Sequence, residues 1–153
     1  MHTEPAVPEV APQPAASAGP AGWPVLAVVA IGGAIGAAGR YGVDVVLPAA
    51  PRGFPLGTFL VNVIGCLLIG VLAGVVFRPG AHRLLRPFVA VGVLGGFTTF
   101  STYTVEAVTL ALDDAAGTAL GYLLATVAGS VLAVESGLLL NRWLTYRRHW
   151  DTR

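Results

Sequence analysis

Four long apolar segments constrain the fold of this chain more than any other feature. They cover about residues 23–47, 56–77, 88–112 and 115–140. A helix needs roughly 20 mainly apolar residues to cross the hydrocarbon core of a bilayer, so each segment is long enough to span it. Only 11 % of the 153 residues are charged, which is too few to cover the surface of a soluble domain. The sequence therefore predicts an all-α membrane protein with four transmembrane helices.

The chain outside the spans predicts two tails around a helical domain of residues 23–143. Residues 1–22 are rich in Pro and Ala and lack the basic flank of a secretory signal, so we expect a disordered tail. Residues 144–153 form a basic and aromatic tail. The net charge of +1, with no basic cluster interleaved with aromatics, does not indicate a nucleic-acid partner. All histidines lie outside the spans, and no Cys/His cluster has metal-ligand spacing, so we do not expect an enzyme.

The arginines are distributed unequally between the two sides of the predicted membrane domain. With four spans, both termini lie on the same side. The opposite side carries two arginines, Arg40 and Arg52. The side of the termini carries seven: Arg78, Arg83, Arg86, Arg142, Arg147, Arg148 and Arg153. By the positive-inside rule, the termini of this multi-pass protein are expected in the cytoplasm, with the helices in the cell membrane.

Polar side chains within the spans are candidate functional residues, because an unsatisfied polar group in a bilayer costs several kcal/mol, roughly. Asn62 is the only carboxamide deep in a span, and it could hydrogen-bond to another helix or serve a permeating species. The fourth span carries a polar residue at every fourth position: Thr118, Tyr122, Thr126 and Ser130. This spacing predicts a polar stripe on one helix face.

The third span contains the stretch "GGFTTFSTYTVE", residues 95–106. Two glycines followed by hydroxyl residues favour a helix break near Gly95–Thr99, because both disfavour a continuous helix. A break at membrane depth frees backbone carbonyls, which can form a cation site. Glu106 is expected to reach a vestibule or to pair with an arginine. Glu135 is expected to extend its carboxylate to the membrane surface or to pair structurally. Arg40 could form a local ion pair with Asp44.

Three motifs occur in order: "GGAIGAAGRY" at 32–41, "GTFLVNVIG" at 57–65 and "GGFTTFSTYTVE" at 95–106. Together they resemble the signature of the Fluc/CrcB-type fluoride channels, a family of small four-span bacterial membrane proteins. The resemblance covers about residues 23–143. It implies an antiparallel dimer with two fluoride pathways along its interface, passive export that lowers fluoride toxicity, and a structural Na⁺ ion at the centre of the dimer.

The resemblance also implies a role for particular residues. The implied fluoride pathway consists of Asn62, Phe100, Tyr103, Tyr122, Thr126 and Ser130. The main-chain carbonyls of Gly95 and Thr98 would hold the Na⁺ ion, and Arg40 and Glu106 would have a vestibular or structural role. Tyr103 departs from the family pattern, which has a second phenylalanine there. Its hydroxyl could find a partner in the protein and leave the ring edge available, or could donate to the ion and slow its passage.

Two questions about assembly and function remain open at this level. An antiparallel homodimer requires the same chain to insert in both orientations, whereas seven arginines against two favour a single one. The partner would then be an oppositely oriented paralogue; alternatively, the bias is tolerated and the chain pairs with itself.

The alternative function is a small multidrug-type, proton-coupled exporter, which needs a carboxylate within the first span. Here that span has none before Asp44, at its edge.

Overall fold

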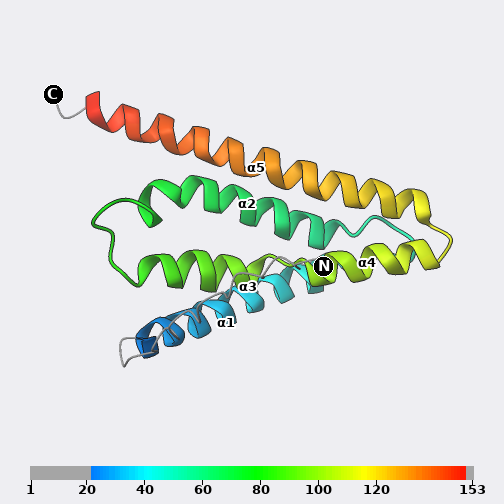
Figure 1. The fold of residues 1–153 in the computed structure, drawn as a ribbon. Coiled ribbons are helices and arrows are strands. Elements are labelled where there is room, and N and C mark those ends of the chain that lie inside the picture. The colour runs from blue at the N-terminus through cyan, green and yellow to red at the C-terminus, as the bar shows by residue number, and fades with distance from the viewer. Residues whose placement is uncertain (1–21, 151–153) are drawn as a thin grey trace, which may run out of the picture.

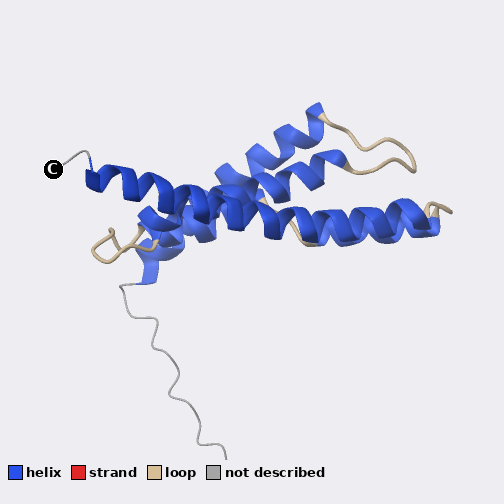
Figure 2. Ribbon diagram, turned by 90° about the horizontal axis from the view of Figure 1, so that it is seen from above, coloured by secondary structure: helices blue, strands red, loops and turns tan. Residues whose placement is uncertain are grey.

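The structure is a computed structural model that describes residues 22–150. The tail expected at residues 1–22 falls almost entirely outside the described residues, as does the end of the tail expected at 144–153. The helices are α1 (Trp23–Val46), α2 (Leu56–Val76), the π-helical segment η2 (Pro87–Leu94), α3 (Gly95–Phe97), α4 (Ser101–Leu112) and α5 (Ala116–Trp150) (Figure 1). Within the described range every regular element is helical, and the loops lie at the ends of the helices (Figure 2).

Four helical stretches are long and apolar enough to cross a membrane, which confirms the predicted fold class. They are Trp23–Val46, Leu56–Val76, Pro87–Leu112 and Ala116–Tyr146. The third consists of η2, α3 and α4 in succession. The fourth helix continues to Trp150, beyond the expected end of its span near residue 140, because no proline or glycine interrupts the chain there.

The helices form two closely packed pairs. α2 lies along α5, and α1 crosses η2 and α3, while α4 packs against the first half of α5 (Figure 1). One end of the bundle carries the α1–α2 loop and the α4–α5 turn, and we call it the α4–α5 end. The other end carries the start of α1, the α2–η2 connection and the end of α5. Four arginines of the described side chains lie in or beside these last segments: Arg78, Arg83, Arg86 and Arg142.

Glycines allow α1 to approach the third span closely. A Cβ atom on Gly36 would collide with the Val93 carbonyl and lie 2.7 Å from the Phe97 amide nitrogen. From the other side, a Cβ on Gly96 would collide with the backbone of Gly33. In lipid, where helix association depends on packing, such contact between backbones is a main source of stability. The glycines of α1 and of the third span therefore form the interface between these two helices.

The pair α2 and α5 uses glycines in the same way. A Cβ on Gly70 would lie 3.0 Å from the Cα of Gly137, and one on Gly137 would lie 2.8 Å from the Val71 amide nitrogen. By contrast, Cβ atoms on Gly117 and Gly121 would meet nothing within 4 Å. Each span contains two glycines four residues apart. Three of these pairs lie at a helix interface, and the pair at the start of α5 lies on an open face: Gly32 and Gly36, Gly70 and Gly74, and Gly92 and Gly96, against Gly117 and Gly121.

The helix break in the third span is present, but it lies at residues 98–100, slightly after the glycines. Gly95 keeps helical backbone angles (φ −66°, ψ −32°), and α3 ends at Phe97. Thr98 is extended (φ −74°, ψ 158°), and α4 begins at Ser101. Gly96 packs against the backbone of Gly33 in α1, so its small size serves helix packing. The break falls on the threonines that follow.

Candidate functional site

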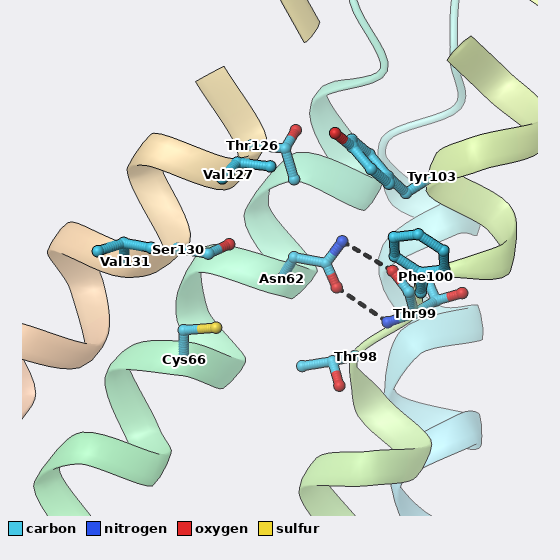
Figure 3. A pocket seen from close by; sticks show the side chains of 10 residues that line it. All are labelled: Asn62, Cys66, Thr98, Thr99, Phe100, Tyr103, Thr126, Val127, Ser130 and Val131. Carbon is cyan, nitrogen blue, oxygen red and sulfur yellow. Dashed lines mark hydrogen bonds between the residues drawn. The ribbon is translucent and has the colours of Figure 1, made fainter. Parts of the chain in front are cut away.

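Asn62 of α2 spans the helix break with two hydrogen bonds. Its Nδ2 donates to the Thr99 carbonyl and its Oδ1 accepts from the Thr99 amide, both at 2.9 Å (Figure 3). The side-chain amide thus takes the place of the helical partners that an extended residue lacks. One of the two N–H protons on Nδ2 is not used by this pair of bonds. Asn62 therefore holds the broken segment and retains one donor.

The break redirects the amides that would normally bond to two carbonyls. In an unbroken helix, the Thr99 amide would donate to the Gly95 carbonyl and the Thr102 amide to the Thr98 carbonyl. Here the Thr99 amide donates to Asn62, and the Thr102 amide donates to the Thr99 hydroxyl at 3.2 Å. The break therefore takes the usual helical donors from the carbonyls of Gly95 and Thr98, the two that the family resemblance implies as Na⁺ ligands. Carbonyl oxygens released in this way suit a hard cation.

Arg40 of α1 contacts the same region from the opposite side of the third span. Its Nε lies 3.3 Å from the Gly96 carbonyl, and its Nη1 lies 3.5 Å from the Thr102 hydroxyl. Within residues 22–146, whose side chains are described, no ion pair joins it to Asp44, so the local ion pair considered from the sequence does not form. The guanidinium instead supplies a donor to a carbonyl at the end of α3.

An open groove of about 340 Å³ lies beside the break, between α2, α5 and the start of α4. It is lined by Asn62, Cys66, Thr98, Thr99, Phe100, Tyr103, Thr126, Val127, Ser130 and Val131 (Figure 3). Five of the six residues predicted for the fluoride pathway line this groove; Tyr122 is the exception. The structure thus gathers residues from three separate spans into one site.

Two groove residues have unusual surroundings. Thr126 is only 4 % exposed, and its hydroxyl is the one buried side-chain oxygen or nitrogen without a hydrogen-bond partner among the described residues. A buried hydroxyl without a partner is costly, and the Thr126 hydroxyl therefore remains available as a hydrogen-bond donor at the groove. Phe100 is 78 % exposed, although it stands at the start of a membrane-spanning helix in the middle of the site.

The two tyrosines lie on the buried side of the groove, and both hydroxyls are bonded within the protein. The Tyr103 hydroxyl donates to the Leu123 carbonyl of α5 at 2.9 Å. The Tyr103 ring centroid lies 5.9 Å from that of Phe100 and 5.2 Å from that of Tyr122. The Tyr103 hydroxyl was expected either to find a partner in the protein or to donate to the ion. In the single chain it has a protein partner. Tyr122 is fully buried and lies behind Tyr103, outside the groove lining.

Glu106 is held by two hydroxyl groups. Its Oε1 accepts from Thr58 at 3.0 Å, and its Oε2 accepts from Tyr122 at 2.7 Å. No arginine pairs with it among the side chains that the structure describes, so of the two expectations for Glu106 the ion pair is wrong. Glu106 also lines a small cavity of about 110 Å³ with Asp44, Thr58 and Thr102. This cavity lies toward the α4–α5 end of the bundle.

Sequence reasoning missed four residues of the groove: Cys66, Thr99, Val127 and Val131. Cys66 lies one turn after Asn62 on the same face of α2, so helical spacing could have identified it. Val127 and Val131 follow Thr126 and Ser130 directly, but an apolar residue in a membrane helix carries no polar signal. Thr99 bonds to Asn62 through its backbone amide and carbonyl, and only the path of the chain through the break reveals that.

Comparisons with known proteins agree on one family. The family model described as "CrcB-like protein, Camphor Resistance (CrcB)" matches residues 27–138. The chain is 50 % identical over 126 residues to "Fluoride-specific ion channel FluC 1" of Streptomyces coelicolor, covering 78 % of this chain and 81 % of that protein. It is 47 % identical over 116 residues to "Fluoride-specific ion channel FluC" of Paracoccus denitrificans, covering 76 % and 93 %. It is 47 % identical over 122 residues to "Fluoride-specific ion channel FluC 2" of Nocardia farcinica, covering 79 % and 87 %.

Proposed function

We propose that this chain, which belongs to the CrcB-like family, is a subunit of a fluoride-selective channel through which fluoride leaves the cytoplasm passively. The names of the relatives, at about half identity over most of both chains, support a fluoride channel. The groove beside the break supports the same function independently, because it presents hydrogen-bond donors and aromatic ring edges at membrane depth.

The observation that carries the proposal is the buried Thr126 hydroxyl without a partner, in the same groove as Asn62 and Ser130. Fluoride is small and strongly hydrated, so a pore must replace its water with donors. The Thr126 hydroxyl and the remaining N–H of Asn62 can donate to an anion. The edge of an aromatic ring is positive, so Phe100 can contribute its ring edge to the same path. A dense set of neutral donors favours a small anion over chloride without placing a fixed positive charge in the pathway.

The groove is proposed to be completed by a second subunit of the same family in antiparallel orientation. Phe100 is largely exposed, and the α5 side chains beside it, Val127 and Val131, are more than half exposed as well. Without a partner these residues would face lipid while the groove remained open along one side. A second copy of the groove residues would close the pathway and supply further ring edges to it.

We further propose that a structural Na⁺ ion binds at the centre of the dimer. The carbonyls of Gly95 and Thr98 fit such an ion, because the break deprives both of their usual helical donors. Two subunits related by a twofold axis would bring two copies of each carbonyl together. A bound cation would supply the positive charge that these carbonyl dipoles require in a site without water.

The proposed orientation places the α2–η2 connection and the chain termini in the cytoplasm. Of the arginines whose side chains the structure describes, Arg52 lies in the α1–α2 loop and Arg40 contacts the break in the third span. The other four lie in the α2–η2 connection or in the second half of α5: Arg78, Arg83, Arg86 and Arg142. We therefore propose that the subunit inserts in one orientation and pairs with a paralogue of the opposite orientation. Two of the similar proteins carry the numbered names FluC 1 and FluC 2, which fits chains that occur in pairs.

Reconstituted liposomes test the proposed function. We expect fluoride to leave vesicles that contain the protein, with its paralogue where one exists, while chloride is retained and no pH gradient is needed. Phe100→Ile removes the ring edges and should abolish this efflux while the dimer persists in detergent, since an apolar side chain still covers the surface. Efflux that requires a proton gradient would instead identify an exporter. Unchanged efflux in Phe100→Ile would refute the assignment of the pathway to this groove.

A further inference from the structure

The α1–α2 loop, residues 47–55, crosses the α4–α5 end of the bundle and is fastened there by Arg52. We call this segment the strap. The Arg52 Nε donates to the Asp113 carbonyl at 2.8 Å, and Asp113 is the residue that caps the C-terminus of α4. The guanidinium therefore stabilises a carbonyl that has no partner within its helix. The Arg52 backbone is left-handed, with φ of 58°. This conformation is uncommon for a residue other than glycine, asparagine or aspartate, which indicates that contacts hold the strap in place.

Phe54 connects the strap to the buried tyrosines. Its ring centroid lies 5.3 Å from that of Tyr122 at an interplanar angle of 84°, and 5.5 Å from that of Phe59 at 72°. Edge-to-face arrangements such as these are favourable for aromatic rings. Phe54 is 38 % exposed, so it covers the fully buried Tyr122 from the end of the bundle.

The rings continue from Tyr122 to the groove. Tyr122 contacts Tyr103 with centroids 5.2 Å apart, and Tyr103 contacts Phe100 with centroids 5.9 Å apart. We call Phe54, Tyr122, Tyr103 and Phe100 the aromatic row. Its first ring belongs to the strap, and its last two line the groove. Every neighbouring pair in the row is in contact, so a displacement of Phe54 is passed on by direct packing.

The strap also covers Glu106, to which Tyr122 donates its hydroxyl hydrogen bond. Two cavities, of about 110 and 190 Å³, flank this carboxylate. Ala49 and Pro55 of the strap line both of them. The position of the strap therefore sets the space around Glu106 and, through it, the position of the Tyr122 hydroxyl.

We propose that Phe54 is a positioning residue of the fluoride pathway: held by the Arg52 strap, its ring fixes Tyr122 and thereby the Tyr103 and Phe100 rings at the groove. The proposal rests on the channel function proposed above. A pathway selects a small anion only if its walls cannot move, because ring edges that drift away from the ion no longer replace its water. Phe54 itself does not line the groove, so its effect on the ion is indirect.

Two measurements on Phe54→Ala test this proposal. We expect fluoride efflux to fall about two- to tenfold, the range that loss of one or two aromatic pairs implies. We also expect faster hydrogen exchange at the amides of residues 98–104, which lie beyond direct contact with residue 54. Phe54→Tyr keeps the ring and should restore both values. Phe77→Ala serves as the matched control, because Phe77 is a half-exposed aromatic residue at the opposite end of α2 and lies outside the row.

The second variant, Arg52→Gln, leaves the buried rings unchanged. It therefore still tests the proposal if Phe54→Ala does not fold. It should increase exchange in the strap and, to a smaller extent, at residues 98–104. The proposal is overturned if both variants leave exchange at residues 98–104 as it is in the wild type, or if Phe54→Ala reduces efflux no more than Phe77→Ala does. If the wild type itself carries no fluoride, the channel function fails, while the exchange comparison still decides whether Phe54 fixes the rings.

Discussion

At the scale of single residues, the site depends on side chains that replace missing backbone partners. Asn62 bonds to both polar groups of the Thr99 peptide at the break. Arg40 donates to the Gly96 carbonyl at the end of α3, and Arg52 does the same for the Asp113 carbonyl at the end of α4. Within a bilayer no water can take over the bonds of Asn62 and Arg40, so both side chains stabilise the backbone conformation at the break.

Replacing Asn62 tests the bond pair at the break. Asn62→Ala leaves the Thr99 amide and carbonyl without partners, a loss of about 1–3 kcal/mol for each buried group. We expect a lower unfolding temperature in detergent and a large loss of fluoride efflux. Val75→Ala, at an exposed position of α2 outside the groove, should resemble the wild type; an equal loss in that variant would contradict a specific role for Asn62.

Tyr103 provides a test in which we expect only a small effect, because its ring and its hydroxyl have separate roles. Tyr103→Phe removes the bond to the Leu123 carbonyl, which also accepts within α5 and therefore keeps a partner. We expect a loss of only about 0.5–1.5 kcal/mol in stability and fluoride efflux close to that of the wild type. If efflux instead rises strongly in Tyr103→Phe, the hydroxyl contacts the ion and slows it, contrary to the bonding in the single chain.

At the scale of elements, glycine determines which helices touch. The contact between α1 and the third span and the contact between α2 and α5 both bring backbones together at glycines. The third span adds a π-helical segment, η2, before α3. Such segments are rare and often lie near functional sites, because they shift the rotation of the helix that follows. Here η2 directly precedes the broken helix that lines the groove.

Two glycines of α1 allow a matched test of this packing. Gly36→Ala would place a methyl group against the Val93 carbonyl and the Phe97 amide, both of which are backbone atoms that cannot move aside. We expect α1 to be displaced, with a loss of at least about 1–3 kcal/mol in stability, as overpacking typically causes. Gly33→Ala adds the same methyl group three residues earlier, where nothing lies within 4 Å, and should be tolerated. Equal thermal stability of the two variants would show that the contact at Gly36 is not close in the membrane.

At the scale of the whole molecule, the groove of a single chain is open on one side, and the two ends of the bundle differ in their number of arginines. The groove is open along the side where Phe100 is exposed, and the arginines of the described side chains lie mainly at one end of the bundle. Both features bear on the proposed partner: a second subunit would close the groove, and the distribution of arginines favours one orientation for this chain. An antiparallel partner of the opposite arginine bias would satisfy both.

Expression of this chain alone tests the restriction on orientation. A C-terminal reporter that fluoresces only in the cytoplasm should give a strong signal, while a reporter active only outside should give almost none. Purified protein expressed without a paralogue should show weak fluoride efflux from liposomes. Replacing Arg78, Arg83 and Arg86 with glutamine should produce mixed orientation by the positive-inside rule. Robust efflux from the unmodified chain alone would rule out an obligatory paralogue.

The sequence by itself determined the four spans, the presence of a break in the third and most of the groove residues. These features depend on local properties: the length of an apolar segment, the low helix propensity of Gly and Thr, and the spacing of polar residues along a helix. Three ordered motifs then identified the family without any structure. The position of the break was less accurate, because Gly95 and Gly96 both stay helical and the chain leaves the helix only at the threonines that follow.

Only the tertiary structure decided which polar groups bond to each other. Glu106 is bonded to Thr58 and Tyr122, and Tyr103 reaches a carbonyl of α5. Each of these bonds joins different helices, so it depends on how far each helix is rotated and how closely it approaches its neighbour. Many residues along a span could face a partner, and composition does not distinguish among them. Close packing at the glycines sets those rotations and therefore places the strap, the aromatic row and the groove relative to one another.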